Sequence, residues 1–258
     1  MLTEILTKGF EKVYQEDMES QTNFITTIAK EVRGMNPDIL FEMNAVYIPN
    51  NDYMKFYWGS AIMEPKFDCY RNFEECNWAN FMIFPIRDIL DNIVGIVGFN
   101  PTNKLLSYEE ETFHLNAYRH SNKSVLNKSL FFFGPKGSLK RAIDEGYMIL
   151  TDGVFDTISC TQEDLIANAA LGSFLSDEQK TILNCIETLY LAEDNDEAGL
   201  KMAQQLRSFH RDVRLIKFNK VKDIDNIINS KYKEEFLKVF KRERELNIKR
   251  DIRLRLKD

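Results

Sequence analysis

The chain has 258 residues, of which 44% are apolar and 29% charged, so it is long enough to bury a core and too apolar for a disordered protein. Its 34 Lys and Arg against 40 Asp and Glu give a net charge of −6, which excludes a uniformly basic nucleic-acid-binding surface. The sequence shows neither the basic start and apolar run of a signal peptide nor an apolar span of about 20 residues, which predicts a cytoplasmic protein with no membrane partner.

The first part of the chain predicts helices followed by a β-hairpin. Apolar residues recur every three or four positions over residues 2–33, which indicates one helix, or two helices separated within the polar run Gln15–Thr22. Residues 81–86 and 93–99 are apolar and β-prone and flank a polar turn, which is typical of a hairpin. Ser107 to Glu110 has the spacing of a capping box and predicts a further short helix.

From about residue 139, strand-like and helix-like segments alternate. The strand-like segments are residues 148–151, 169–170 (weakly), 189–192 and 213–218. Helical patterns separate them, and the capping box Ser176–Gln179 opens one that runs to about Ile186. Such alternation is typical of a parallel sheet covered by helices, so the predicted fold class is α/β, with a mostly parallel sheet flanked by helices.

The end of the chain differs in charge from the rest. Residues 231–258 carry a net charge of +5, whereas the other 230 residues carry −11. Apolar residues spaced in multiples of four, from Phe236 to Leu256, predict a basic amphipathic C-terminal helix. We therefore expect three parts: a smaller α+β N-terminal subdomain (1–138), a domain built on the parallel sheet (139–230) and the C-terminal helix (231–258).

Acidic side chains follow three of the predicted strands: Asp152 and Asp156, Asp194 and Asp196, and Asp223 and Asp225. The carboxyl ends of parallel strands form the ligand-binding edge of such sheets, so these six carboxylates are expected to converge. Like charges at ~4 Å repel by about 1–4 kcal/mol, and divalent cations relieve that repulsion. A single acidic pair is more typical of a solvated turn or a helix N-cap, as Asp196 would be before Glu197. Three acidic pairs together favour a metal site.

These segments resemble the Toprim domain of bacterial and phage DnaG-type primases. The resemblance rests on Thr151–Asp156, Ala170–Ser173, Asp194–Gly199 and Lys222–Asp225, in matching order and approximate spacing. Upstream, Phe84–Asp88 followed by Val94-Gly95 resembles the family's F-P-I hairpin. Lys128, six residues before Gly134, takes the place of the lysine in the family's F-H-K-G motif. The resemblance covers roughly residues 80–230.

The resemblance implies a DNA primase, which is a nucleotidyltransferase that makes short RNA primers on single-stranded DNA by two-metal chemistry. It also implies that residues 139–230 form a Toprim catalytic domain, preceded by the N-terminal subdomain of a primase core. Catalytic Mg²⁺ or Mn²⁺ would be held by Asp152, Asp194 and Asp196, with Asp223 and Asp225 as further carboxylates. Asp152 replaces a family glutamate and is one methylene shorter, which alters its reach to a metal.

The resemblance also implies partners. Lys128 and Lys222 would neutralise NTP or template phosphates. The family's arginines beside the hairpin are replaced by phenylalanines, so further contacts would come from Arg87, Arg119 or Lys123. We expect no counterpart of the family's zinc-binding domain, and none of its helicase-binding domain unless the basic C-terminal helix replaces it. The expected partners are therefore a replicative helicase and a separate zinc-binding or template-recognition protein. The lack of these domains also favours a phage-encoded chain, which would act in the cytoplasm of its host.

Several alternatives stay open. The same acidic residues would serve a Toprim metal-dependent nuclease, and a non-catalytic module that binds DNA or a replisome partner would account for the altered residues. Lys136, Lys140 and Arg141 fit either a phosphate track or a solvated helix face. The run Phe131–Phe133 fits either base stacking or a core. The dispersed cysteines and histidines indicate no zinc site.

Overall fold

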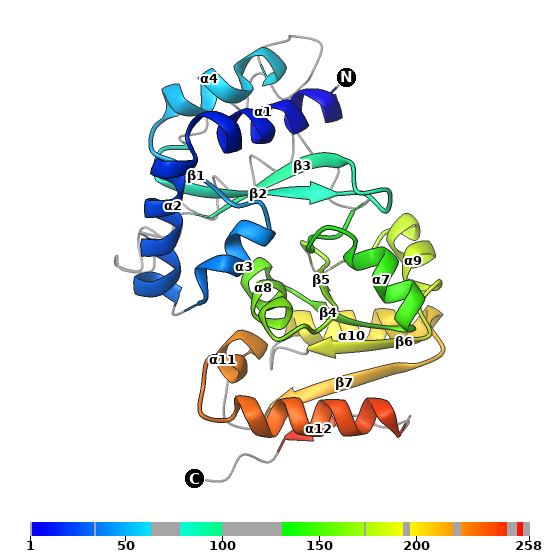
Figure 1. Cartoon of the computed structure of the whole chain (residues 1–258). Helices are drawn as coiled ribbons and strands as arrows, with labels where there is room; N and C mark the ends of the chain where they lie inside the picture. The colour runs from blue at the N-terminus through cyan, green and yellow to red at the C-terminus, as the bar shows by residue number, and fades with distance from the viewer. Residues whose placement is uncertain are drawn as a thin grey trace. The chain divides into compact units, whose positions relative to one another are not determined.

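The computed structural model of the protein describes residues 2–33, 35–62, 78–99, 131–172, 174–192, 197–218, 223–246 and 252–254. The chain forms two compact units, residues 1–128 and 129–258, and each contains one sheet (Figure 1). The helix expected from Ser107 lies outside the described residues. The sequence-based division at residues 138–139 and 230–231 stays a prediction.

The first unit combines helices with a three-stranded antiparallel sheet of order β1-β2-β3. Its described elements are α1 (Leu2–Glu16), α2 (Met18–Thr27), the π-helix η1 (Ile28–Arg33), α3 (Pro37–Glu42), β1 (Val46–Ile48), α4 (Asn51–Ile62), β2 (Phe81–Arg87) and β3 (Ile93–Phe99). The pairing of β2 with β3 confirms the predicted hairpin. Residues 2–33 are two helices with a break at Asp17, inside the polar run, followed by the π-helical turn.

The core of the first unit forms where α1 packs on α4 and β3. The indole of Trp58 is fully buried, meets the ring of Phe10 edge-on and donates to the Leu6 carbonyl at 3.3 Å. Gly9 allows this approach, because a Cβ at that position would lie 2.2 Å from Trp58 Nε1. These aromatic side chains are therefore core residues of this unit.

The second unit contains a parallel sheet of order β5-β4-β6-β7-β8. Its strands are β4 (Tyr147–Thr151), β5 (Ala167–Ala169), β6 (Thr188–Ala192), β7 (Val213–Phe218) and β8 (Ile252–Leu254). Strands β4 and β6 are almost wholly apolar, as expected of strands covered on both faces. The sequence pattern from residue 139 predicts a parallel sheet, and the structure confirms it.

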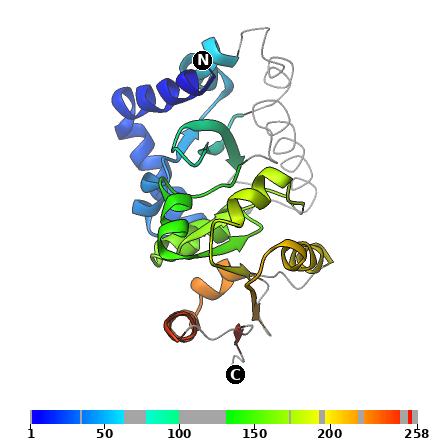
Figure 2. The same ribbon diagram turned by 90° about the vertical axis from the view of Figure 1, so that its right-hand side faces the viewer.

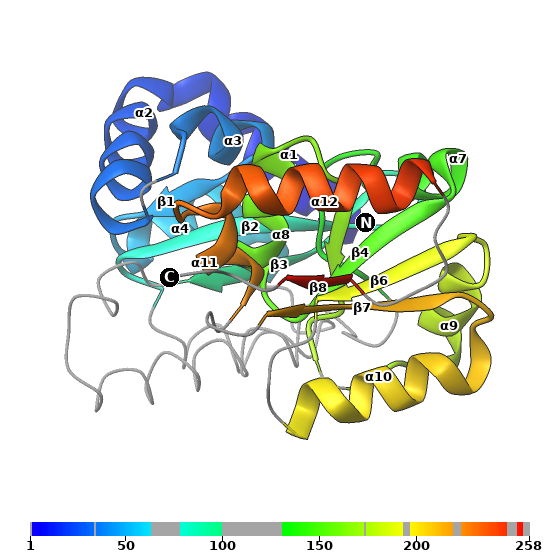
Figure 3. The ribbon, with the colours of Figure 1, turned by 90° about the horizontal axis from the view of Figure 1, so that it is seen from below.

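Helices connect these strands and cover the sheet. They are α7 (Ser138–Glu145), α8 (Val154–Gln162), α9 (Asp177–Leu183), α10 (Glu197–Phe209), α11 (Ile224–Ile228) and α12 (Lys233–Glu245). Helices α10 and α12 lie on opposite faces of the sheet (Figures 2 and 3). Both hydrogen bonds of the capping box predicted at Ser176 and Gln179 are present, although α9 ends at Leu183 and not near Ile186.

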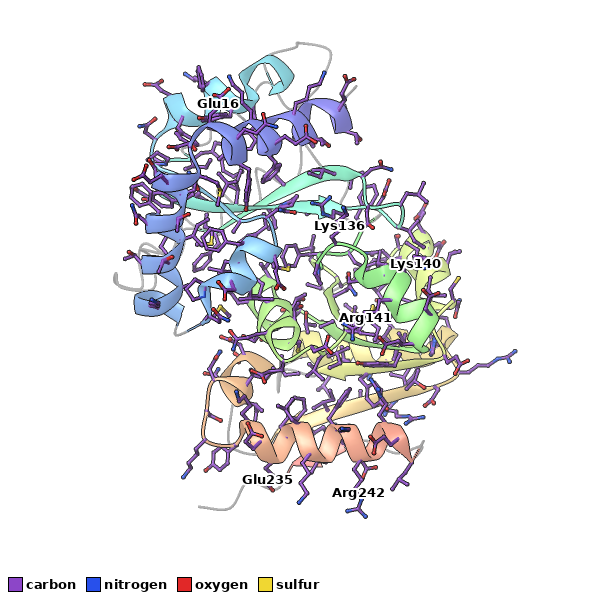
Figure 4. The ribbon with its side chains drawn as sticks, viewed as in Figure 1. Glu16, Lys136, Lys140, Arg141, Glu235 and Arg242 are labelled. Atoms are coloured by element: carbon purple, nitrogen blue, oxygen red, sulfur yellow. The ribbon has the colours of Figure 1, made fainter. Side chains whose placement is uncertain are left out.

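The C-terminal helix is shorter than the sequence predicted. Helix α12 ends at Glu245, and Ile252–Leu254 instead form β8, which pairs in parallel with β7. Pairing with β8 satisfies the backbone of β7, which would otherwise be an edge strand. The amphipathic character of α12 itself is as expected, because Phe236 and Phe240 are buried while Glu235 and Arg242 point away from the sheet (Figure 4). Among the described residues, no helix has the length and apolarity that crossing a membrane requires.

Candidate active site

The strand order of the parallel sheet defines a ligand-binding edge. From β4 the chain crosses to β5 on one side, and then to β6 on the other side of β4. The carboxyl ends of β4 and β6 therefore flank a topological switch point, where open α/β sheets bind ligands. Asp152 directly follows β4, and residues 193–196 follow β6. Asp194 and Asp196, like Lys128 and Lys222, lie outside the described residues.

The turn between β4 and α8 is closely packed around Gly153. The hydroxyl groups of Thr151 and Thr157 share a hydrogen bond of 2.7 Å, and both lie within hydrogen-bonding distance of the Gly153 carbonyl. A Cβ on Gly153 would lie 2.7 Å from Asp156 Oδ2, so glycine leaves room for this carboxylate. The side chain of Asp152 is exposed at the same turn. The local sequence thus buries two threonines and presents one acid to solvent.

The structure brings Asp156 and Asp225 together, although 69 positions separate them. Asp156 Oδ1 accepts a hydrogen bond from the backbone N–H of Asp225 at 3.2 Å. Asp225 Oδ1 in turn accepts from Ser159 Oγ at 2.5 Å and from Asn229 Nδ2 at 2.6 Å. Helices α8 and α11 are therefore joined at their N-terminal turns by a carboxylate network. Positive helix ends stabilise negative side chains in this position.

Asp223 caps helix α11. Its Oδ1 accepts from the backbone N–H of Asn226 at 2.8 Å and from the side-chain amide of Asn226 at 2.7 Å. This is the N-cap function that a short acidic motif commonly has. Asp223 and Asp225 are thus both used in holding α11 in place, beside the carboxyl end of β7.

A buried thiol lies close to this network. Burial, and then the charges of Asp156 and Asp225, raise the pKa of the Cys160 thiol well above its ordinary value. Cys160 is fully buried on α8 and stays protonated near neutral pH. It is therefore a core residue, and the sequence gives it no reactive role.

The described residues contain only part of a metal-binding set. No group of three or more His, Cys, Asp or Glu side chains among them is arranged to hold a metal ion. The donor chemistry nevertheless fits Mg²⁺ or Mn²⁺, which prefer carboxylate oxygens. Asp152 is an exposed carboxylate at the switch point. The sequence of residues 193–196, which follow the neighbouring strand, contains further carboxylates. A complete set requires residues from that segment.

Arg87 has structural partners in the first unit. Its guanidinium donates to Asn44 Oδ1 at 2.8 Å and to the carbonyl of Asp91 at 3.0 Å, which braces the turn between β2 and β3. Burial lowers the pKa of this guanidinium. Phe81, which stands in place of a family arginine, is buried in the core, while Arg119 and Lys123 lie outside the described residues.

Packing decides one of the open alternatives. Phe132 and Phe133 are buried, so this run contributes to the core. On α7, Lys140 pairs with Asp144 at 2.8 Å, and Arg141 pairs with Glu145 and Asp164, each at 2.7 Å (Figure 4). These two cations lie on a solvated helix face with acidic partners, but exposed pairs are weak, so the phosphate track stays a prediction for them and for Lys136.

Sequence reasoning missed Ser159 and Asn229. Asn229 is four residues after Asp225, a spacing that places two side chains on one helix face, so its contact could have been expected. Ser159 contacts Asp225 across 66 positions, and nothing in the sequence indicates that contact.

Comparison with known proteins agrees with this geometry. Residues 149–228 match the family model described as Toprim-like. Solved structures similar to this chain include the DnaG primase catalytic domain bound to ssDNA, with 15% identity, 93% of this chain and 78% of that chain covered, and a TM-score of 0.68. The Escherichia coli primase catalytic core has 14% identity over 96% of this chain and 83% of that chain, with a TM-score of 0.67. The zinc-binding and RNA polymerase domains of the Aquifex aeolicus primase have 20% identity over 92% of this chain and 59% of that chain, also with a TM-score of 0.67.

Comparison with curated protein sequences gives no match. The identities to the solved structures are low, so the likeness concerns the fold. The second unit contains a Toprim-like domain, and the chain has the fold of the DnaG primase catalytic core. The predicted fold class and the resemblance to the DnaG-type primase core are therefore confirmed.

Proposed function

We propose that the chain is a DNA primase, which synthesises short RNA primers on a single-stranded DNA template. One observation carries the proposal: the Toprim-like match includes all three acidic segments, and the strands preceding them, β4, β6 and β7, are adjacent in one parallel sheet. The likeness of the fold to DnaG catalytic cores, one of them bound to ssDNA, supports the same activity. Primer synthesis joins an incoming NTP to a primer 3′-hydroxyl with release of pyrophosphate.

In this proposal Asp152, Asp194 and Asp196 hold Mg²⁺ or Mn²⁺. Such ions would neutralise the triphosphate and stabilise the attacking and leaving oxygens. Asp223 and Asp225 are further carboxylates of the same edge, and their described contacts position α11. Asp156 accepts the Asp225 N–H and so fixes the turn that presents Asp152. Catalysis of this kind consists largely of positioning and charge stabilisation.

Phosphate contacts and partners complete the proposal. Lys128 and Lys222 would contact the triphosphate or the template backbone, as compact positive charges do. The guanidinium of Arg87 already donates hydrogen bonds to Asn44 and to the carbonyl of Asp91. It would therefore contact nucleic acid while it is held at the turn between β2 and β3. A replicative helicase, a separate template-recognition protein and a cytoplasmic location, in the host if the chain is viral, stay predictions.

The test is an assay with the full chain, single-stranded DNA, labelled NTPs and Mg²⁺ or Mn²⁺. We expect short RNA products that depend on the metal and fall at least about 100-fold in Asp194→Ala. The control is Asp144→Ala on α7, which removes an exposed carboxylate paired with Lys140 and should leave synthesis unchanged.

Other products would overturn the proposal. Cleaved DNA without RNA would indicate the Toprim nuclease. DNA binding without any product, and without any effect of metal chelation, would indicate a non-catalytic module.

A further inference from the structure

Phe174 is an exposed aromatic residue on the segment that follows β5. Its side chain is 74% exposed. It lies on the segment that leaves β5, whose neighbour in the sheet is β4. The N–H of Ala170 donates to the carbonyl of Thr151 at 3.2 Å, so this segment begins directly beside the strand end that carries Asp152.

The backbone on the far side of Phe174 is held firmly. Leu175 is fully buried. Its N–H donates to Gln205 Oε1 at 3.0 Å, and its carbonyl accepts from Gln205 Nε2 at 3.2 Å. Ser176 follows as the N-cap of α9. Because neighbouring side chains of an extended segment point to opposite sides, the burial of Leu175 directs Phe174 outwards. The ring is therefore presented to solvent from a fixed backbone.

A lysine accompanies the ring. Lys180 Nζ lies 6.0 Å from the centroid of Phe174, at the limit of a cation–π contact. Lys180 also pairs with Asp177 at 2.8 Å, and the side chain of Asp177 is almost fully exposed. Exposed ion pairs of this kind contribute little stability, so Lys180 can exchange its carboxylate for a phosphate. An aromatic face beside a lysine is the combination that binds an unpaired base and its backbone.

We propose that Phe174 stacks on an unpaired base of single-stranded nucleic acid that passes the acidic edge, with Lys180 at the adjoining phosphate. The inference rests on the proposed function, because the template is the single strand. A protein partner would instead be expected to cover a larger apolar patch, whereas Phe174 extends alone from a braced segment. The site is specific to bases and not to sequence, because every base offers a π-face.

The first experiment measures binding of two fluorescent oligonucleotides of equal length, one of thymidines and one of abasic sites, at fixed salt. Phe174→Ala should weaken binding of the thymidine strand at least about fivefold and leave binding of the abasic strand unchanged. Phe174→Tyr should restore the affinity. The matched control is Leu246→Ala, at another apolar residue that is 59% exposed, and it should change neither affinity.

The second experiment detects stacking directly. Trp58 and Trp78 are buried, so Phe174→Trp adds an exposed fluorophore. Its emission should be quenched by the thymidine strand and not by the abasic strand. Equal quenching by both strands, or unchanged affinity in Phe174→Ala, would overturn the inference.

The two proposals fail in different ways. If the native chain makes primers and Phe174→Ala binds thymidines normally, stacking is refuted and the primase stands. If no RNA forms while Phe174→Ala loses only base-dependent binding, the primase is refuted and the stacking site stands.

Discussion

The two edges of the parallel sheet differ in how their charged side chains are paired. At the amino edge, Arg214 donates to both carboxylate oxygens of Asp212, at 2.6 and 3.0 Å, and to the hydroxyl of Tyr190 at 3.1 Å. Arg214 is only 2% exposed. At the carboxyl edge, Asp156, Asp223 and Asp225 accept hydrogen bonds from amides and a hydroxyl, and Asp152 is exposed at the turn that follows β4.

This difference separates a structural use of charge from a binding use. Arg214 joins β7 to β6 through its hydrogen bond to the hydroxyl of Tyr190. The guanidinium of Arg244, 4.3 Å from the ring centre of Tyr147, extends the cluster to α12. The carboxylates at the other edge all carry negative charge, so they repel one another. Substitutions at the amino edge should therefore lower stability, and substitutions at the carboxyl edge should mainly lower activity.

The largest effect on stability is expected for Arg214→Leu. It leaves Asp212 without its bidentate partner and Tyr190 without a hydrogen bond, and breaking such a buried pair costs about 3 kcal/mol. Urea denaturation measures the free energy of unfolding. The control is Arg141→Leu, whose pairs with Glu145 and Asp164 are exposed and should contribute at most about 1 kcal/mol. Equal losses in the two variants would contradict the assignment of the amino edge as structural.

An intermediate effect is expected for Gly153→Ala, which acts on both stability and activity. The added Cβ would lie 2.7 Å from Asp156 Oδ2 and displace the carboxylate that accepts the Asp225 N–H. Loss of that part-buried hydrogen bond should lower the free energy of unfolding by about 0.5–1.5 kcal/mol, again measured in urea. Gly172→Ala is the matched control, because a Cβ there meets nothing within 4 Å. If Gly153→Ala left the free energy of unfolding unchanged, the network between α8 and α11 would not be rigid.

Much of the fold followed from local patterns. Two apolar, β-prone runs around a polar turn identified the hairpin, and the capping box at Ser176 located the start of α9. The tail was predicted wrongly past Glu245, because a three-residue strand is too short to show a period and Ile252 also fits a helical spacing. Only the sheet reveals that β7 needs a partner on that side. Long-range pairing of this kind leaves no signal in the sequence.

The site was predictable in outline and not in detail. Acids after successive strands indicated one edge, because parallel strands end together. The spacing of the acids does not distinguish those that also serve as caps and links. These are Asp223, which caps α11 at Asn226, and Asp225, which contacts Ser159. Those contacts depend on how α8 and α11 pack, which is a property of the folded chain.

The smallest effect on stability, with a large effect on activity, is expected for Asp152→Asn. The residue is exposed, so the free energy of unfolding should change by no more than about 0.5 kcal/mol. Primer synthesis should fall at least about 100-fold, and its half-saturation should shift to higher Mg²⁺ concentration, since a neutral amide is a weaker ligand than a carboxylate. The control Asp144→Asn, on exposed α7, should alter neither quantity. If Asp152→Asn lowered stability as much as Arg214→Leu, or left synthesis intact, the two edges would not divide structure from chemistry as their contacts indicate.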